Sequence, residues 1–218
     1  MEKMVFKRIK SNLEIDEFLT RFENYVGVKL PNSYAIHSKI VGIFLQERLV
    51  GGYMLVTGPN LRSVMFLPDS IKKSSMLFNK DPYEFMEVNG LWMSPAIKTA
   101  KQQFRVWMHI LIDIFITKKR YIMLMGDAKN SNIRKIHHLT SPTNLFIGKP
   151  ILMAGETTHE EICVSYTTRW RMLLGLRKYR QEYREREKRE SMRAHRLVTS
   201  PANHDNFKHI DPEPTHQI

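Results

Sequence analysis

The sequence contains a single cysteine, Cys163, among its 218 residues, and it has no long uninterrupted hydrophobic run. One cysteine cannot form an internal disulfide, so we expect a reducing compartment, the cytoplasm. The longest apolar stretch, residues 106–116, is interrupted by His109 and Asp113. It falls short of the roughly 20 apolar residues of a transmembrane helix, so no such span is expected. No hydrophobic segment with a cleavage site opens the chain, and we expect no secretory signal.

Metal-binding patterns are also lacking. The sequence has nine histidines, but they form neither an HExxH pair nor a cluster with cysteine at ligand spacing. We therefore predict that the protein holds no metal. Cys163 has no histidine at an informative spacing, so we expect it to act as a small buried hydrophobic residue, ahead of the alternative role of nucleophile.

Positive charge is the feature that the sequence has in abundance. Its 34 Lys and Arg residues exceed its 22 Asp and Glu residues by 12. Such a surplus suggests an acidic partner, which could be nucleic acid, an anionic membrane surface, a phosphorylated cofactor or an acidic carrier protein. Residues 169–196 alone carry eleven Lys or Arg and four Glu, a surplus of seven.

The C-terminal part of the chain is predicted to differ from the rest. Residues 169–196 are expected to form a basic amphipathic helix, in which the first turns dock and the charged remainder projects. Residues 197–218, including His204 and His209, lack periodicity and are predicted to be a disordered tail. The side chains expected to dock the helix are Trp170, Met172, Leu173, Leu176, Tyr179 and Tyr183.

Hydrophobic periodicity predicts one mixed domain over residues 1–168. Strands are expected at residues 4–9, 39–45, 49–56, 62–67, 87–93, 121–125, 145–154 and 161–166. Helices are expected at residues 13–25, 99–118 and 133–139, and residues 68–82 are expected to be an irregular connection. The buried stripe of the helix at 99–118 is expected to be Phe104, Trp107, Met108, Leu111, Ile112 and Phe115.

Three segments of this pattern carry recognisable motifs. Residues 87–95 read EVNGLWMSP, residues 43–54 read IFLQERLVGGYM, and residues 130–137 read NSNIRKIH. In this order and spacing they resemble the fourth strand, the hairpin of the second and third strands, and the fourth helix of the GNAT superfamily, the acyl-CoA-dependent N-acyltransferases. The resemblance covers about residues 5–166. It implies an α/β (α+β) fold with a mixed, mostly antiparallel sheet flanked by helices, followed here by a basic C-terminal helix.

One family motif is degenerate in this chain. In the family, a turn of the type Arg/Gln-x-x-Gly-x-Gly/Ala wraps the CoA pyrophosphate at a helix N-terminus, where glycine lets phosphate approach the backbone N–H groups. The aligned residues 98–103 read KTAKQQ, so side chains stand at both glycine positions. These side chains obstruct the close backbone wrap, whereas Lys98 and Lys101 can hold phosphate as point charges.

The resemblance also implies roles in proton transfer. Glu87 matches the position that serves some family members as general base for the amine; the alternative is an ordinary strand carboxylate paired with Lys or Arg. His137, or the adjacent His138, falls where many members carry a tyrosine that protonates the leaving thiolate. The alternative is a helix histidine with no chemical role.

Donor binding is implied for four further residues. Trp92, Met93 and Ser94 would offer backbone groups to pantetheine, and are otherwise plain strand residues. Asn130 would help to position the cofactor arm, although capping of a helix is enough to explain it.

The function implied by the resemblance is N-acyl transfer to a small-molecule or protein amine. The donor would be acyl-CoA, or an acyl-phosphopantetheine on an acyl carrier protein, which depends less on the pyrophosphate turn and suits a basic enzyme. The alternative is a catalytically silent GNAT-like domain whose helix at 169–196 contacts a protein, nucleic acid or an anionic membrane. No helix-turn-helix, zinc or aromatic RNA-binding signature supports nucleic-acid recognition.

Overall fold

A computed structural model describes residues 3–151 and 160–199 of the chain. Its seven strands form one sheet in the order β1-β2-β3-β4-β5-β7-β6. All neighbours are antiparallel except β4 and β5, which are parallel. The strands are β1 Met4–Ile9, β2 Lys39–Leu45, β3 Arg48–Thr57, β4 Phe85–Met93, β5 Tyr121–Asp127, β6 Thr143–Gly148 and β7 Ile162–Thr168. The predicted mixed, mostly antiparallel sheet is therefore confirmed.

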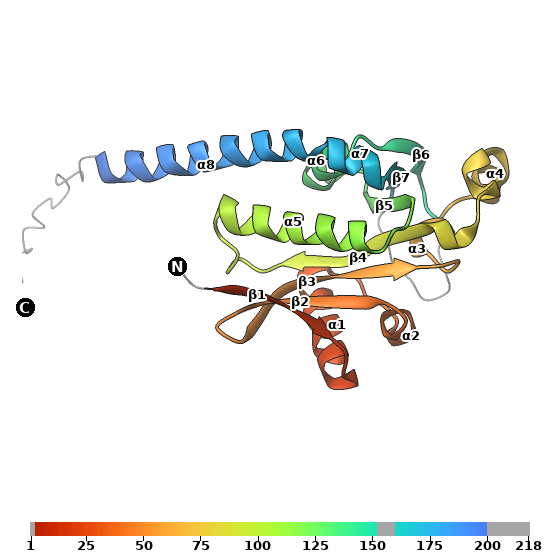
Figure 1. The fold of residues 1–218 in the computed structure, drawn as a ribbon, viewed down its shortest axis with the longest axis horizontal. Coiled ribbons are helices and arrows are strands. Elements are labelled where there is room, and N and C mark those ends of the chain that lie inside the picture. The colour runs from red at the N-terminus through yellow and green to blue at the C-terminus, as the bar shows by residue number, and fades with distance from the viewer. Residues whose placement is uncertain (1–2, 152–159, 200–218) are drawn as a thin grey trace, which may run out of the picture.

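Helices cover both faces of this sheet (Figure 1). The helices α1 and α2 lie on one face, and α5 lies on the other with α8 stacked above it. The α-helices are α1 Asn12–Val26, α2 Asn32–Ile36, α3 Arg62–Met65, α4 Asp69–Ser74, α5 Ala100–Ile116, α6 Ser131–Leu139, α7 Arg169–Leu174 and α8 Leu176–Thr199. Two short 3₁₀ helices, η1 Met76–Asn79 and η2 Pro82–Glu84, lead into β4.

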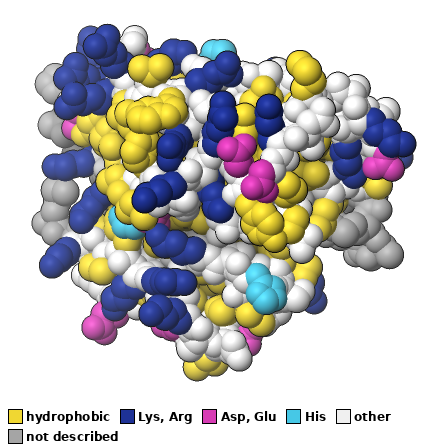
Figure 2. All heavy atoms as spheres, turned by 45° about the vertical axis from the view of Figure 1, so that its right-hand side comes forward, with side chains coloured by type: hydrophobic (Ala, Val, Ile, Leu, Met, Phe, Trp, Pro, Cys, Tyr) yellow, Lys and Arg dark blue, Asp and Glu magenta, His cyan; other side chains and the backbone are white. Residues whose placement is uncertain are grey.

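The surface carries its positive charge broadly. Figure 2 shows Lys and Arg side chains spread over the face in view, with exposed hydrophobic side chains gathered between them. Of the net charge of +12, residues 169–196 supply seven and the rest of the chain supplies five. The basic character is thus not confined to the C-terminal helices.

Local sequence signals account for the first elements. Ser11 and Glu14 form a capping box that starts α1, and Gly27 ends this helix in the left-handed conformation at φ 74°. The two residues between β2 and β3, Gln46 and Glu47, also have positive φ angles, of 48° and 64°. This is the turn geometry that matches the right-handed twist of a tight hairpin.

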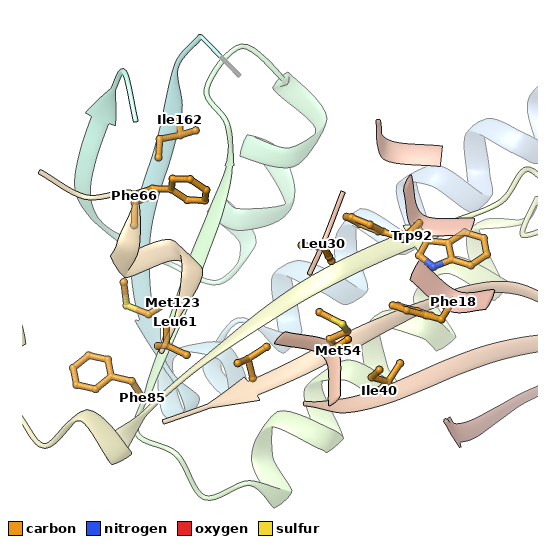
Figure 3. Packing of buried hydrophobic residues seen from close by; sticks show 14 of the residues in the cluster. Phe18, Leu30, Ile40, Met54, Leu61, Phe66, Phe85, Trp92, Met123 and Ile162 are labelled. Carbon is orange, nitrogen blue, oxygen red and sulfur yellow. The ribbon is translucent and has the colours of Figure 1, made fainter. Parts of the chain in front are cut away.

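The sheet separates two hydrophobic clusters because successive side chains of a strand point to opposite faces. On the α1 side, Phe18 and Trp92 lie over Ile40 and Met54 (Figure 3). On the α5 side, Tyr53 and Leu55 of β3 pack with the buried residues of α5. The apolar side chains of β2, β3 and β5 thus alternate between the two clusters.

The helix α5 is apolar on two sides. The side chains it buries against the sheet are Val106, Ile110 and Ile114. The stripe expected from the sequence faces another way: Phe104 contacts Tyr183 of α8, and Phe115 contacts Trp170 of α7. The sequence therefore predicted the helix correctly, but the stripe it indicated includes the side that packs against α7 and α8. The side that packs against the sheet was not identified.

A buried polar cluster ties α5 to the sheet. The Tyr53 hydroxyl donates a hydrogen bond to Asp113 Oδ2 at 2.7 Å and lies 2.8 Å from His109 Nδ1. Lys39 Nζ lies 2.8 Å from Asp113 Oδ1. Burial beside the carboxylate raises the pKa of Tyr53, so its hydroxyl stays protonated and acts as a donor. The cluster fixes the position of α5 over β2 and β3.

Three sequence expectations are corrected by the structure. Residues 62–67 were expected to form a strand, but α3 occupies Arg62–Met65. The connection 68–82 was expected to be irregular, but it contains α4 and η1. The end of the expected strand at 145–154 lies outside the described residues, and β6 ends at Gly148.

The C-terminal segment forms two helices in place of one. The break falls at Gly175, where an added Cβ would lie 2.6 Å from the Leu139 carbonyl oxygen. Of the expected anchors, Trp170 and Leu173 are exposed, whereas Met172 and Tyr179 are buried. The expected tail at 197–218 begins within α8, and its residues 200–218 lie outside the described part of the chain.

The parallel strands β4 and β5 part soon after they meet. Their register comprises only Phe85 with Tyr121, Met86 with Ile122, and Glu87 with Met123. Beyond Glu87, β4 carries a bulge, because its residues 90 and 91 lie opposite a single residue of β3. Gly90 at this bulge has a φ of 58°, and the Asn89 side chain accepts a 2.7 Å hydrogen bond from its backbone N–H group. The bulge turns β4 away from β5.

Gly90→Ala is expected to lower the free energy of unfolding by about 1–2 kcal/mol, because a side chain in the left-handed region is strained. The new Cβ would also lie 3.1 Å from Met54 Cγ. Urea denaturation measures the change. Gly27→Ala is the matched control, since Gly27 shares the positive φ but has no heavy atom within 4 Å of an added Cβ. The control should lose less stability because it lacks the contact with Met54, and a Gly90→Ala variant as stable as wild type would contradict this account.

Candidate active site

A cavity of about 240 Å³ lies where β4 and β5 part. Its walls include residues 88–91 of β4 and residues 124–127 of β5. The cavity passes between the strands, so residues from both faces of the sheet line it. Six of the apolar ones are Phe22, Leu30 and Phe66 from the α1 side, and Trp107, Leu111 and Met172 from the α5 side. A mostly apolar cavity with few polar groups is the usual form of a small-molecule site.

The polar groups of the lining are few and belong to separate elements. They are Arg62, Asn89, Asp127, His137, Thr140 and Tyr179. Arg62 is buried, and its guanidinium carbon lies 5.3 Å from the centre of the Phe66 ring. No group of three or more His, Cys, Asp or Glu side chains in the described residues is arranged to hold a metal ion.

Glu87 lies beside the cavity, behind its wall. Its side chain is on the α1 face and only 2% exposed. The carboxylate accepts hydrogen bonds from the backbone N–H groups of Arg62 and Ser63 at 3.0 and 2.9 Å, and from the hydroxyl groups of Tyr34 and Ser63. The Asn89 amide donates a fifth bond at 3.3 Å. Because Asn89 lines the cavity, it connects Glu87 to the cavity interior.

The environment of Glu87 shifts its protonation. Burial raises the pKa of the Glu87 carboxyl to about 7, against the opposing effect of the hydrogen bonds from Ser63, Arg62 and Asn89. A carboxyl group with a pKa near neutrality is suited to accept a proton at physiological pH.

The two candidate histidines are placed differently. His137 lines the cavity, whereas His138 is exposed and does not belong to the lining. Burial lowers the pKa of His137 to about 4, so its imidazole is neutral at pH 7. A neutral ring can accept a proton but is not the imidazolium that a histidine general acid would supply at this pH.

The three donor-arm candidates at the end of β4 lie away from the cavity. Trp92 is buried on the α1 face, where its ring stacks on Tyr25 at 4.9 Å, and it pairs with Gly52 of β3. Met93 pairs with Gly51. The Ser94 N–H group donates to the Val50 carbonyl at 2.8 Å. The part of β4 that faces the cavity is the preceding stretch, residues 88–91.

Lys98 and Lys101 flank the start of α5, and both are exposed. The backbone N–H groups of residues 98, 99, 100 and 102 are engaged within the chain. Thr99 and Gln102 form a capping box, in which Gln102 Oε1 also accepts from the Lys98 N–H group at 2.9 Å. The Ala100 N–H group donates to the Glu190 carboxylate of α8, at 2.9 Å to Oε1 and 3.2 Å to Oε2.

Asn130 is exposed just before α6, where its carbonyl accepts a 3.1 Å hydrogen bond from the Arg134 N–H group. It does not belong to the cavity lining, whereas Asp127, at the end of β5, does. The structure therefore brings His137 to the cavity and Glu87 next to it, but leaves the other candidates outside the wall.

Sequence reasoning missed Asn89, Arg62 and Tyr179. Asn89 lies within the recognised strand motif, two residues after Glu87, so the strand period could have placed it on the same face. Arg62 gave no local signal, and the apolar stripe indicated Tyr179 only as a docking residue of the C-terminal helix. Both reach the cavity through the folding of α3 and α8 onto the sheet. Burial raises the pKa of Tyr179, which keeps its hydroxyl protonated.

A seven-stranded sheet that opens between two parallel central strands, with a cavity at the opening, defines a fold class. Comparison with solved structures identifies it: the chain has the fold of the GNAT superfamily of N-acyltransferases. The fold expected from the sequence motifs is thereby confirmed.

Three solved structures show the likeness. FeeM, an N-acyl amino acid synthase from uncultured soil microbes, aligns with a TM-score of 0.55 at 13% identity, over 85% of this chain and 96% of that chain. An IAA acetyltransferase from Bacillus cereus has a TM-score of 0.53 at 8% identity, over 76% and 99%. A GNAT family acetyltransferase from Elizabethkingia anophelis with acetyl-CoA bound has 0.52 at 9%, over 77% and 99%.

At these identities the likeness establishes the fold. No protein-family model and no curated protein sequence matches the chain. None of the helices in the described ranges, 3–151 and 160–199, is both long and apolar enough to cross a membrane.

The pKa of Glu87 predicts a pH dependence of stability. Because the folded-state pKa is raised from 4.5 to about 7, the contribution of Glu87 to stability is full below pH 4.5 and is lost as the pH rises through 7. Between pH 5 and pH 8, wild type should therefore lose about 2.5 kcal/mol relative to Glu87→Gln, which cannot ionise. Denaturant unfolding of both proteins over this range measures the difference.

Glu23→Gln is the control, since Glu23 is exposed on α1. It should follow wild type at every pH. A Glu87→Gln variant whose stability runs parallel to that of wild type would show that the carboxyl group titrates well outside this window.

Proposed function

We propose that this protein is an N-acyltransferase that moves an acyl group from a thioester donor to an amine. The observation that carries the proposal is the apolar cavity between the parted strands β4 and β5, with His137 in its wall and Glu87 behind Asn89. FeeM, an N-acyl amino acid synthase, and the acetyltransferases of the same fold are named for acyl transfer. The shared fold supports the same reaction class here.

The reaction assigns a task to each side of the cavity. The amine nitrogen attacks the thioester carbonyl carbon, the carbon–sulfur bond breaks, one amine proton leaves, and the thiolate takes up a proton. Among the described strands, β4 has no partner on its β5 side beyond Glu87. Backbone N–H groups along residues 88–91, other than that of Gly90, which Asn89 Oδ1 engages, can therefore polarise the carbonyl oxygen and stabilise the tetrahedral intermediate.

His137 is the proposed acceptor of the amine proton. It lines the cavity and, with a pKa of about 4, is neutral and able to accept a proton at pH 7. Glu87 is the alternative base, with a pKa near 7, and it would act across Asn89. The exposed His138 is not given a role.

The donor is proposed to be an acyl-CoA or an acyl-phosphopantetheine on an acyl carrier protein. A neighbour of the same fold binds acetyl-CoA. The apolar lining suits an acyl chain longer than acetyl, and Lys98 and Lys101 are the proposed contacts for donor phosphate, with Asn130 and the backbone of residues 92–94 further along the donor arm. The acceptor is a small-molecule or protein amine, for which the name of FeeM suggests an amino acid. The proposed compartment is the cytoplasm.

One observation favours the second candidate, a catalytically silent binding domain that uses α8 to contact a protein, nucleic acid or an anionic membrane. The start of α5, where relatives are expected to bind the pyrophosphate, lacks glycine and is engaged by Glu190. Absence of turnover with every acyl thioester and amine offered would support this candidate.

The cavity is tested by narrowing it. Val88→Phe replaces a small aliphatic side chain of the β4 wall with an aromatic ring and should lower kcat/KM about tenfold or more for donors with acyl chains of eight or more carbons. Acetyl donors should be affected much less, because an acetyl group is too short to need the space that the phenylalanine ring fills. Turnover is measured as release of free thiol, and the N-acyl product is identified by mass spectrometry.

Val5→Phe is the matched control, on β1 and outside the cavity lining. It should not discriminate between chain lengths. Equal loss for short and long donors in Val88→Phe would show that the acyl chain does not enter this cavity.

The proton acceptor is tested with the adjacent histidines. His137→Ala should lower kcat about 100-fold or more, the usual contribution of a general base, whereas His138→Ala should remain close to wild type. The pH profile of kcat/KM then separates the candidates: a rise near pH 4 identifies His137, and a rise near pH 7 that disappears in Glu87→Gln identifies Glu87. Equal activity of both alanine variants would remove His137 from the mechanism.

A further inference from the structure

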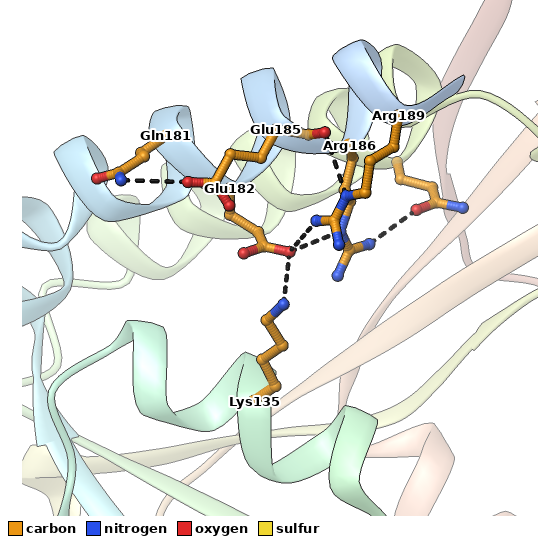
Figure 4. Close-up of polar contacts among 7 residues, drawn as sticks. Lys135, Gln181, Glu182, Glu185, Arg186 and Arg189 are labelled. Carbon is orange, nitrogen blue, oxygen red and sulfur yellow. Dashed lines mark hydrogen bonds and ion pairs between the residues drawn. The ribbon is translucent and has the colours of Figure 1, made fainter. Parts of the chain in front are cut away.

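The helix α8 crosses the first turn of α5 and is held there by several contacts. Tyr183 packs against Phe104 with ring centres 4.8 Å apart, and Arg186 Nη1 donates to Gln103 Oε1 at 3.1 Å. On the other side, Glu182 binds Lys135 of α6 at 2.8 Å, together with Arg186 (Figure 4). The position of α8 is therefore fixed against both α5 and α6.

Glu190 lies at the end of this series of contacts. Both of its carboxylate oxygens accept from the Ala100 N–H group, the first of α5. The N-terminus of a helix carries a partial positive charge and free N–H groups, so an anion is favoured there. In this protein the anion is a side chain of the chain itself.

The same stretch of α8 covers the space between α5 and α6. A small cavity of about 30 Å³ remains under it, lined by Ala100, Phe104, Trp107, Ile136, Tyr183 and Arg186 among others. Trp107, Ile136 and Tyr179 also line the main cavity. The two cavities therefore share a wall, and α8 lies over the smaller one, which reaches Ala100 at the start of α5.

We infer that residues 179–190 of α8 form an internal strap whose Glu190 competes with the donor's diphosphate for the start of α5. The inference rests on the proposed function, because it concerns the thioester donor of the same site. A diphosphate that approaches Ala100 must displace one carboxylate and meets its negative charge. Free CoA is accordingly a poor ligand, and the strap selects donors that carry no diphosphate at this position.

The neighbouring carboxylates of α8 are engaged elsewhere. Glu185 accepts from the Gln181 side chain at 3.2 Å, and Glu187 accepts from the Tyr183 hydroxyl at 3.0 Å. Glu190 is thus the one described α8 carboxylate recorded at the start of α5, and a change at this position alone should alter the competition.

The experiment measures binding of CoA and of pantetheine, which lacks phosphate, to the full chain by calorimetry. Glu190→Gln removes the charge and keeps the size of the side chain. It should bind CoA about tenfold more tightly or better, since a charged competitor for a charge-assisted hydrogen bond is lost. Its affinity for pantetheine should stay within about twofold of wild type. Melting temperatures verify that each variant is folded, which is expected because Glu190 is exposed.

Glu185→Gln is the matched control, with the same change of net charge on the same helix. It should leave the affinity for CoA close to that of wild type. If both variants bound CoA more tightly by the same factor, the gain would come from the change in net charge alone, and the inference would be overturned. So would unchanged or undetectable CoA binding in Glu190→Gln, or an equal gain for pantetheine.

Binding requires no turnover, so this test is separate from that of the proposed reaction. Tighter CoA binding by Glu190→Gln in a protein without transferase activity would keep the strap and reject the reaction. The opposite outcome is acyl transfer from pantetheine donors together with a CoA affinity that Glu190→Gln leaves unchanged. It would support the proposed reaction and reject the strap.

Discussion

The brief pairing of β4 with β5 is the constraint on which the rest of the structure depends. The parallel register ends at Glu87 with Met123, and the bulge at Gly90 then turns β4 toward β3. Because the strands separate in the middle of the sheet, side chains from both faces reach one space. A continuous sheet would keep the two hydrophobic clusters apart and would leave no cavity between them.

Glu87 stands at the point of separation and ties three elements together. It accepts hydrogen bonds from Tyr34 of α2, from the backbone at the start of α3, and from Asn89 of its own strand. Burying a carboxyl group is costly unless donors surround it. The five bonds offset that cost and hold α3 over the strand, while the raised pKa leaves a proton acceptor one side chain away from the cavity.

The C-terminal helices complete the site from the other face. Met172 and Tyr179 enter the cavity wall, and the helix then continues over α5 to Glu190. The turn at residues 98–103 lacks the glycines that the family uses to bind pyrophosphate, and the Glu190 carboxylate binds an N–H group of this same turn. Both features reduce the contacts available to a diphosphate, so the degenerate motif and the position of α8 have the same consequence for donor binding.

The sequence by itself determined the elements and their class, because the apolar runs at 39–45 and 49–56, the cap of α1 and the motif at residues 87–95 are local signals. It also indicated Glu87 and His137. Only the tertiary structure decided which apolar side of α5 faces the sheet, that Glu87 lies behind Asn89, and that His137 rather than His138 reaches the cavity. Arg62, Tyr179 and Glu190 are distant in sequence from the residues they meet. Contacts of this kind arise from the packing of whole elements, which no local period of the sequence encodes.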